Sequence, residues 1–229
     1  MTDTAPHCVE IGEWKLLPER MALHKETGAL VVADLHLGYS RERAHRGDAV
    51  PIPTLDEELA PLRAAWRREK PDCLIFAGDL VEKARADLAR AAGAWLQQEG
   101  IRVGGLVRGN HDGSRVSWPF PVLPDGHPLG RYQIWHHWPN TGNPVVHGHE
   151  HPALPLPRLG MVPCFLLDES RLILPAYSCD AAGGNIFRRK DLHEIRSMLC
   201  LAVAGTRVEN MSTVGDLEKA LVSRKGYPK

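Results

Sequence analysis

The chain has 229 residues, of which 43% are hydrophobic, and its 28 basic side chains balance 28 acidic ones. This length predicts one domain over residues 1–229 that buries roughly 70–75% of the surface of the unfolded chain. The formal charge of zero excludes a uniformly basic or acidic surface, although a local basic groove is compatible with it.

The N-terminal segment Met1–Glu13 contains acidic residues and lacks the apolar run of a signal peptide. No stretch of the sequence approaches the roughly 20 apolar residues of a membrane-spanning helix. Five cysteines are dispersed without C-x-x-C spacing, which favours free thiols in a reducing compartment over disulfides or a cysteine zinc site. We therefore expect a cytoplasmic protein without membrane partners.

Apolar runs rich in β-forming residues recur along the chain, and most are followed directly by a polar cluster. Runs of this kind, bounded by Gly or Pro, predict buried strands. The predicted strands are Ala29–Ala33, Cys73–Ala77, Val103–Val107, Tyr132–Trp135 and Pro144–Val146, with a further strand near Leu199–Val203.

Helices are predicted between these strands and near the end of the chain. Thr54 and Glu57 form a T-x-x-E capping box, and Pro61 is expected to kink or break the helix that follows. Further helices are expected over 86–98 and near Val214–Ser223. Alternating strands and helices followed by a strand-rich half predict an α/β fold of stacked layers with mixed sheets.

The polar clusters after the strands contain the residue types that bind metals. Because open α/β sheets place ligand sites beyond the carboxyl ends of their strands, these side chains are expected to converge on one rim. Carboxylates and imidazoles bind Mn²⁺, Fe and Zn²⁺, and two ions about 3.5–4 Å apart can share one carboxylate. The candidates are Asp34, His36, Asp79, Asn110, His111, His136, His149 and His151.

The order of these motifs resembles that of the calcineurin-like metallophosphoesterases: D-x-H, G-D, G-N-H-D, a histidine and G-H-x-H, between about Ala29 and His151. The resemblance implies a layered α/β/β/α sandwich, with two mixed β-sheets flanked by helices. It also implies a dinuclear metal site. Carried over by motif, Asp34, His36 and His151 would bind the first metal. Asn110, His136 and His149 would bind the second, and Asp79 would bridge the two.

The same resemblance implies catalytic roles for two neighbouring residues. His111 would not bind metal but would stabilise the transition state or protonate the leaving oxygen, and Asp112 would orient it. A hydroxide that bridges the metals would attack phosphorus in line, with Arg108 or His111 offsetting the developing charge. Such a protein hydrolyses phosphodiester bonds.

Some positions have alternative interpretations. Relatives often show H-G-H where this chain has Trp135-His136-His137-Trp138, so His137 is an alternative ligand to His136. His147 is expected to be buried and structural rather than a ligand. Glu82, three residues after Asp79, either contacts a ligand histidine or has no role in the site.

A narrower resemblance extends to the motifs Arg46-Gly47, Val50-Pro51 and Leu174–Ser178. They are similar to those of the ICC-like phosphoesterases that include the ligase-associated DNA-damage-response endonucleases (PdeM). This implies Mn²⁺ as the cofactor, with Fe, Zn²⁺, Ni²⁺ and Co²⁺ as alternatives. It also implies single-stranded DNA as substrate, and a DNA ligase or helicase as partner.

The basic run Arg41, Arg43, His45 and Arg46 either contacts nucleic-acid phosphates or is a solvated helix face. Two rival functions follow. One is a phosphoesterase or pyrophosphatase that acts on small nucleotides or phosphomonoesters. The other is a non-catalytic scaffold, which the complete set of motifs disfavours.

Overall fold

The computed structural model describes residues 5–139, 141–181 and 183–222. The strands of the first sheet are β1 (Val9–Ile11), β2 (Trp14–Leu17), β3 (Met21–His24), β4 (Ala29–Val32), β5 (Cys73–Ala77), β6 (Val103–Val107) and β7 (Val122–Leu123). Those of the second are β8 (His127–Leu129), β9 (Tyr132–Trp135), β10 (Val145–His147), β11 (Pro152–Leu156), β12 (Gly160–Leu167), β13 (Arg171–Ile173), β14 (Gly184–Asn185), β15 (Leu199–Ala204) and β16 (Arg207–Thr213). The helices are α1 (Tyr39–His45), α2 (Leu55–Glu69), α3 (Ala86–Gln98), α4 (Leu192–Ile195) and α5 (Val214–Val222), with short 3-10 turns η1 (Glu82–Ala84) and η2 (Ile186–Arg188).

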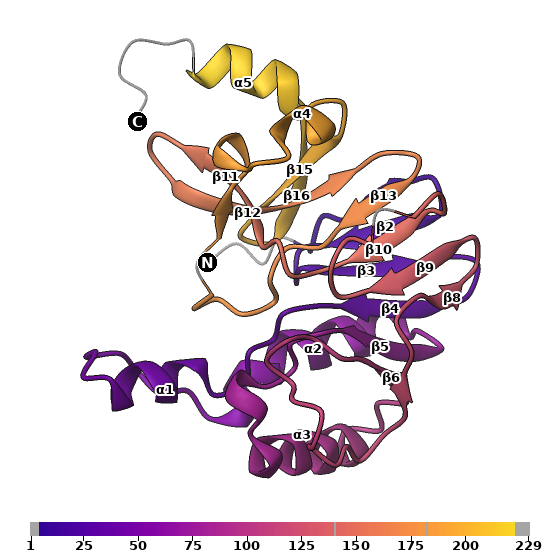
Figure 1. Cartoon of the computed structure of the whole chain (residues 1–229), viewed down its shortest axis with the longest axis vertical. Coiled ribbons are helices and arrows are strands. Elements are labelled where there is room, and N and C mark those ends of the chain that lie inside the picture. Colours follow the sequence, from indigo (N-terminus) through magenta and orange to yellow (C-terminus); the bar gives the residue numbers. More distant parts are fainter. Residues whose placement is uncertain (1–4, 140, 182, 223–229) are drawn as a thin grey trace.

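The two sheets stack face to face, with helices on both outer sides (Figure 1). The first has the order β1-β2-β3-β4-β5-β6-β7, with antiparallel pairs up to β4 and parallel pairs from β4 onward. The second has the order β14-β11-β12-β13-β10-β9-β8, and β15 pairs with β12 and β16. Parallel and antiparallel pairs occur in both sheets, so the predicted mixed α/β sandwich is confirmed.

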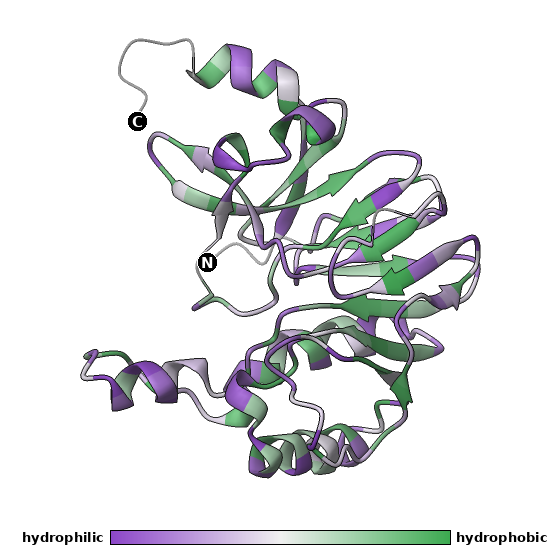
Figure 2. Cartoon of the chain, viewed as in Figure 1, coloured by the Kyte–Doolittle hydropathy of each residue, from purple (hydrophilic) through white to green (hydrophobic). Residues whose placement is uncertain are grey.

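Three apolar clusters hold these layers together, and the pleat of β4 shows how one strand serves two of them. Ala29 and Val31 face the cluster between the sheets, whereas Leu30 and Val32 face the cluster beneath α2 and α3. Successive strand residues point to opposite faces, so a continuous apolar run can be buried on both sides. The third cluster lies under α4 and α5, and Figure 2 shows in green the hydrophobic residues along the strands and helices.

Helix α2 passes through Pro61 without ending, so of the two predicted outcomes, a kink or a break, the break is wrong. Beside the proline, a tyrosine hydroxyl group is inserted into one backbone hydrogen bond of the helix. Tyr177 Oη accepts a hydrogen bond from Leu62 N at 3.2 Å and donates one to Glu58 O at 2.8 Å. These two backbone groups would bond each other in an undisturbed helix. The predicted capping box between Thr54 and Glu57 is confirmed.

The other predicted elements agree with the structure to within a residue or two, as the definition of element ends allows. Ser223, the expected end of the last helix, lies outside the described residues. Within those residues, no helix combines the length and apolarity that a membrane crossing requires.

Candidate active site

The polar clusters meet where the loops after β4 and β5 run side by side. Asp34 N donates to Gly78 O at 3.0 Å, and His36 N donates to Asp79 O at 2.9 Å. The loop after β10 joins them from the second sheet, because His149 N donates to Oδ2 of Asp34 at 2.8 Å. One rim of the sandwich therefore collects residues from both sheets, as the sequence predicted.

The backbone at this rim is strained. Five of the residues predicted to bind metal have positive φ angles: Asp34 (57°), His36 (47°), Asp79 (51°), His149 (68°) and His151 (45°). Non-glycine residues rarely adopt this region, and it persists only where the surroundings hold it. With these backbone conformations, the five side chains lie together at the rim.

The first group of side chains contains Asp34, His36 and His151, each with a potential ligand atom within 4.8 Å of the others. Nε2 of His151 lies 3.2 Å from Oδ1 of Asp34 and 3.5 Å from Nε2 of His36. Asp34 and His36 are buried, and His151 is half-buried. Burial lowers the pKa of His36 despite the nearby Asp79 and Asp34, so its imidazole is neutral and can accept a metal.

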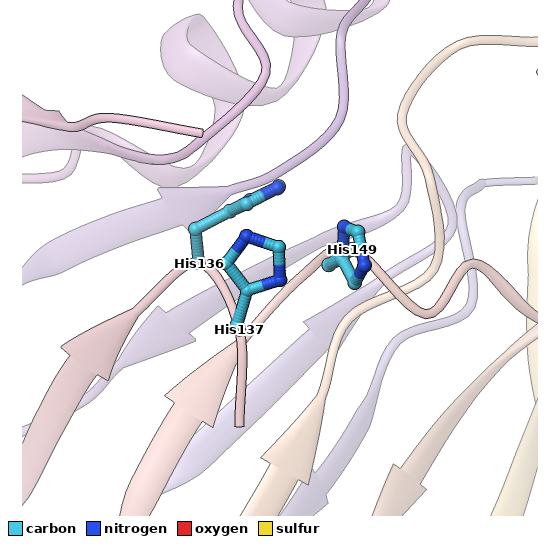
Figure 3. A group of neighbouring side chains, drawn as sticks. All are labelled: His136, His137 and His149. Atoms are coloured by element: carbon cyan, nitrogen blue, oxygen red, sulfur yellow. The ribbon is translucent and has the colours of Figure 1, made fainter. Parts of the chain in front are cut away.

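The second group contains His136, His137 and His149, also with potential ligand atoms within 4.8 Å of one another. Figure 3 shows their rings side by side beyond the strand ends. The ring centroids of His137 and His149 are 4.0 Å apart, and Oδ1 of Asn110 lies 3.1 Å from Nε2 of His136. His136 is buried whereas His137 is exposed, and both remain candidates.

Asp79 lies between the two groups. Its Oδ2 is 3.2 Å from Nε2 of His136 and 3.8 Å from Nε2 of His36, while Oδ1 accepts a hydrogen bond from His111 N at 2.8 Å. Burial opposes the charge on both partners, yet the Asp79 carboxylate raises the pKa of His136 to about 8. Conversely, His136 lowers the pKa of Asp79 to about 2 against the effect of its burial.

Hydrogen bonds to the far nitrogens fix the tautomers of two histidines. Nδ1 of His136 lies 3.0 Å from Ala77 O, and Nδ1 of His36 lies 3.0 Å from Oε2 of Glu82. A carbonyl or carboxylate oxygen accepts a hydrogen bond from Nδ1–H, so Nε2 is the nitrogen that faces the site and would offer its lone pair to a metal. This arrangement is typical of metal-binding histidines.

Glu82 also contacts the expected catalytic histidine. Its Oε2 lies 3.0 Å from Nδ1 of His111, which is half-exposed. The His36 and His111 rings meet edge to face at 4.9 Å. Glu82 is itself buried, in the first turn after β5. Its position three residues after Asp79 was the only signal for this role in the sequence.

Asp112 has different partners from those expected. Its carboxylate accepts hydrogen bonds from Leu80 N at 2.8 Å, Val81 N at 3.2 Å and Gly109 N at 2.8 Å. Burial raises its pKa to about 6 against these bonds. Asp112 thus connects the loop after β6 to the loop after β5 through these hydrogen bonds. Among the described residues, Glu82 is the carboxylate that contacts the His111 ring.

Two glycines of the motifs are required by close packing. A Cβ atom at Gly78, where φ is 92°, would overlap the His136 ring, and one at Gly109 would overlap the Asp79 carboxylate. Glycine is therefore needed before Asp79 and before Asn110 so that the loops can approach each other.

The site contains an unsatisfied acceptor that a cation would complete. Oδ1 of Asp34 is buried and, among the described residues, has no hydrogen bond of acceptable geometry. A buried carboxylate oxygen without a donor is costly. A divalent metal beside Oδ1 would satisfy it, and the carboxylate, imidazole and amide donors are those that Mn²⁺, Fe and Zn²⁺ accept. The residues present fit such a metal.

Other predicted residues lie around the rim. Arg108 is exposed and donates to Ser114 O at 3.2 Å. In α1, which extends from the body in Figure 1, Arg43 pairs with Asp48 at 2.9 Å. His147 is fully buried, and its burial beside Arg171 lowers its pKa to about 3, which agrees with the expected structural role.

A cavity of about 270 Å³ adjoins the first group, with His151, Arg20 and Ser178–Asp180 in its wall. A second, of about 470 Å³, shares Arg20 and Ser178–Asp180 with it and extends along Leu35, Leu37 and Glu58. The first group therefore has a cavity beside it on the His151 side.

A model of the calcineurin-like phosphoesterase family matches residues 29–170 of the chain. Among solved structures, the crystal structure of nuclease MPE from Pseudomonas putida has 26% sequence identity and a TM-score of 0.70, and the match covers 90% of this chain and 100% of that one. No curated protein sequence matches significantly. The family match contains every motif whose side chains meet at the rim.

Proposed function

Because the chain belongs to the calcineurin-like phosphoesterase family, we propose that it hydrolyses phosphodiester bonds at a dinuclear metal site and that its substrate is DNA. Membership makes the protein a metal-dependent hydrolase of phosphoester bonds. The number of metals, their identity and the substrate are parts of the proposal.

The position of Asp79 carries the dinuclear proposal. Its Oδ2 is within 4 Å of Nε2 of both His36 and His136, which belong to different groups. A carboxylate shared in this way is what a pair of ions needs. Asp34, His36 and His151 would hold one ion, and Asn110, His149 and either His136 or His137 would hold the other. Divalent ions such as Mn²⁺ would supply Lewis-acid activation of the phosphoryl group and of a water nucleophile.

In this proposal His111 acts on the leaving group. The Glu82 carboxylate lies 3.0 Å from Nδ1 and would orient the ring, while the half-exposed side chain leaves Nε2 available to substrate. A histidine held this way can donate a proton to the departing oxygen, and the carboxylate stabilises the cationic ring. Glu82 would thus have the orienting role that the family resemblance implied for Asp112.

The DNA proposal is supported by the similarity to nuclease MPE and by the open rim. Asn110, His137 and His149 are exposed, so a chain longer than a mononucleotide can reach them. Arg41 lies in α1 and Arg46 directly follows this helix, which begins one turn after the ligand motif at the end of β4. Cations there would neutralise phosphates that flank the scissile bond.

A comparison of three substrates tests the proposal: a labelled single-stranded oligonucleotide, bis-p-nitrophenyl phosphate and p-nitrophenyl phosphate, each with Mn²⁺. We expect cleavage of the oligonucleotide and of the diester, and little turnover of the monoester. Rapid cleavage of small nucleotides beside an inert oligonucleotide would support the small-molecule alternative instead. Resemblance to the ligase-associated endonucleases extends the proposal to DNA repair, and co-purification with a DNA ligase or helicase would test it.

A further inference from the structure

Arg171 is a buried cation beneath the second group of histidines. It begins β13, which pairs in parallel with β10, and only 4% of its surface is exposed. Arginine is almost never buried to this extent unless it is paired. Its partners form three connections to the two segments that carry the predicted ligands of this group.

The first connection leads to His149 through His147. Arg171 Nε donates to Nε2 of His147 at 3.1 Å, and Nδ1 of His147 lies 2.9 Å from Gly148 O. The carbonyl requires a proton on Nδ1, so Nε2 has a lone pair for the guanidinium. Arg171 therefore fixes both the tautomer of His147 and the peptide that precedes His149.

The second connection leads to His137. The Arg171 guanidinium carbon lies 3.6 Å from the centroid of the Trp138 ring, within the range of a cation–π interaction. Trp138 directly follows His136 and His137, so the same guanidinium contacts the loops on both sides of the second group. Figure 3 shows that His136, His137 and His149 meet between these loops.

The third connection uses acidic residues near α4. Nη2 of Arg171 lies 3.5 Å from Oδ2 of Asp191, which pairs with Arg189 at 2.7 Å. Arg189 in turn pairs with Glu150 at 2.8 Å. Glu150 lies between His149 and His151, so the ionic chain returns to the loop that carries both ligands.

The loop at His149–His151 needs contacts that maintain its unusual backbone conformation, and this network supplies them. His149 and His151 have φ angles of 68° and 45°, a conformation that neighbouring contacts must maintain. Apolar packing alone does not fix the orientation of a backbone carbonyl, whereas the contact from Arg171 through His147 does.

We propose that Arg171 is a positioning residue for the second metal group: it sets the separation of the loop at His136–His137 and the loop at His149, and thereby the affinity of that half of the site. The inference rests on the proposed dinuclear function. Arg171 itself contacts neither substrate nor metal in this role. Loss of such supporting contacts lowers metal affinity by about 10–100-fold in comparable sites.

Titration of the metal-free full-length protein with Mn²⁺ tests this directly, with bound metal counted by calorimetry. Arg171→Met keeps most of the side-chain volume and removes the charge and the Nε donor. We expect one Mn²⁺ equivalent to bind about 10–100-fold more weakly and the other to change by less than about threefold. Asn110→Ala, which removes a proposed ligand of the second metal, should weaken the same Mn²⁺ equivalent as Arg171→Met. His36→Ala, which removes a proposed ligand of the first metal, should weaken the other equivalent. Arg207→Met, which removes an exposed cation on β16, is the control.

Trp138→Leu removes only the aromatic contact and should weaken the same equivalent to a smaller degree. It keeps the inference testable if Arg171→Met does not fold. The inference would be overturned if folded Arg171→Met or Trp138→Leu bound both Mn²⁺ ions with wild-type affinity. It would also be overturned if both ions were bound more weakly to the same degree. A wild-type protein that binds fewer than two Mn²⁺ would instead refute the dinuclear proposal itself.

Discussion

Nε2 of His136 lies 3.2 Å from Oδ2 of Asp79, and each group shifts the pKa of the other. In the metal-free protein the pKa of His136 is raised to about 8. The pair therefore stabilises the fold fully below the usual histidine pKa of about 6.5, and this contribution is lost as the pH rises through about 8. At the acid end, the depressed pKa of Asp79 maintains its contribution until the pH falls from about 4 towards 2.

We expect the metal-free protein to lose on the order of 1–2 kcal/mol of unfolding free energy between pH 6.5 and 9 because of this pair. Urea denaturation in the presence of a chelator measures it. The loss should be smaller in His136→Gln, which cannot take up the proton. Equal pH dependence in the two proteins would contradict the coupling.

Asp79→Asn should remove most of the bound metal, because a neutral amide cannot bridge two cations as a carboxylate does. Elemental analysis of protein purified without chelator measures the loss. Glu209→Gln, which changes a half-exposed carboxylate on β16, serves as the matched control. Unchanged metal content in folded Asp79→Asn would show that Asp79 is not the bridge.

His111→Ala should retain both metals and lose about 10²–10⁴ in kcat, the range for a lost general acid. The deficit should be smaller for a diester with a good leaving group, such as bis-p-nitrophenyl phosphate, because that group needs no proton. Metal loss from this variant would make His111 a ligand and the assigned roles wrong.

Glu82→Gln should lower both metal affinity and kcat. Nδ1 of His36 and Nδ1 of His111 both lie 3.0 Å from Oε2 of Glu82, and a neutral amide oxygen in that place is a weaker acceptor than the carboxylate. We expect about 10–100-fold weaker Mn²⁺ activation. Measuring kcat against Mn²⁺ concentration separates the two effects. A variant with wild-type activation would leave Glu82 without an orienting role.

Tyr177→Phe should reduce the unfolding free energy by about 1–3 kcal/mol, because it leaves Leu62 N and Glu58 O in α2 without their shared partner. Chemical denaturation measures the change. Tyr39→Phe, at the start of α1, is the control. An unchanged denaturation midpoint for Tyr177→Phe would mean that Leu62 N and Glu58 O bond each other directly when the hydroxyl group is absent.

Much of the fold was predictable because its strands are apolar runs with abrupt polar ends. The run Cys73–Ala77 is observed as β5 with the same bounds, and the position of Asp34, Asp79 and His149 after predicted strands indicated that they lie at one rim. What could not be predicted depends on contacts between distant segments. Neither Tyr177 across from Pro61 nor Glu82 beside His111 has a local pattern that names its partner. The same holds for Arg171, whose burial follows from the pairing of β13 with β10.

The five rim residues with positive φ angles limit how the protein can be engineered for stability. Each of the five costs on the order of 1 kcal/mol or more relative to a relaxed backbone. Glycine at Asp34 or His149 would relieve that cost while deleting a metal donor. Selection for thermal tolerance alone would therefore tend to erode this rim, and libraries aimed at a hardier enzyme should hold these five positions fixed.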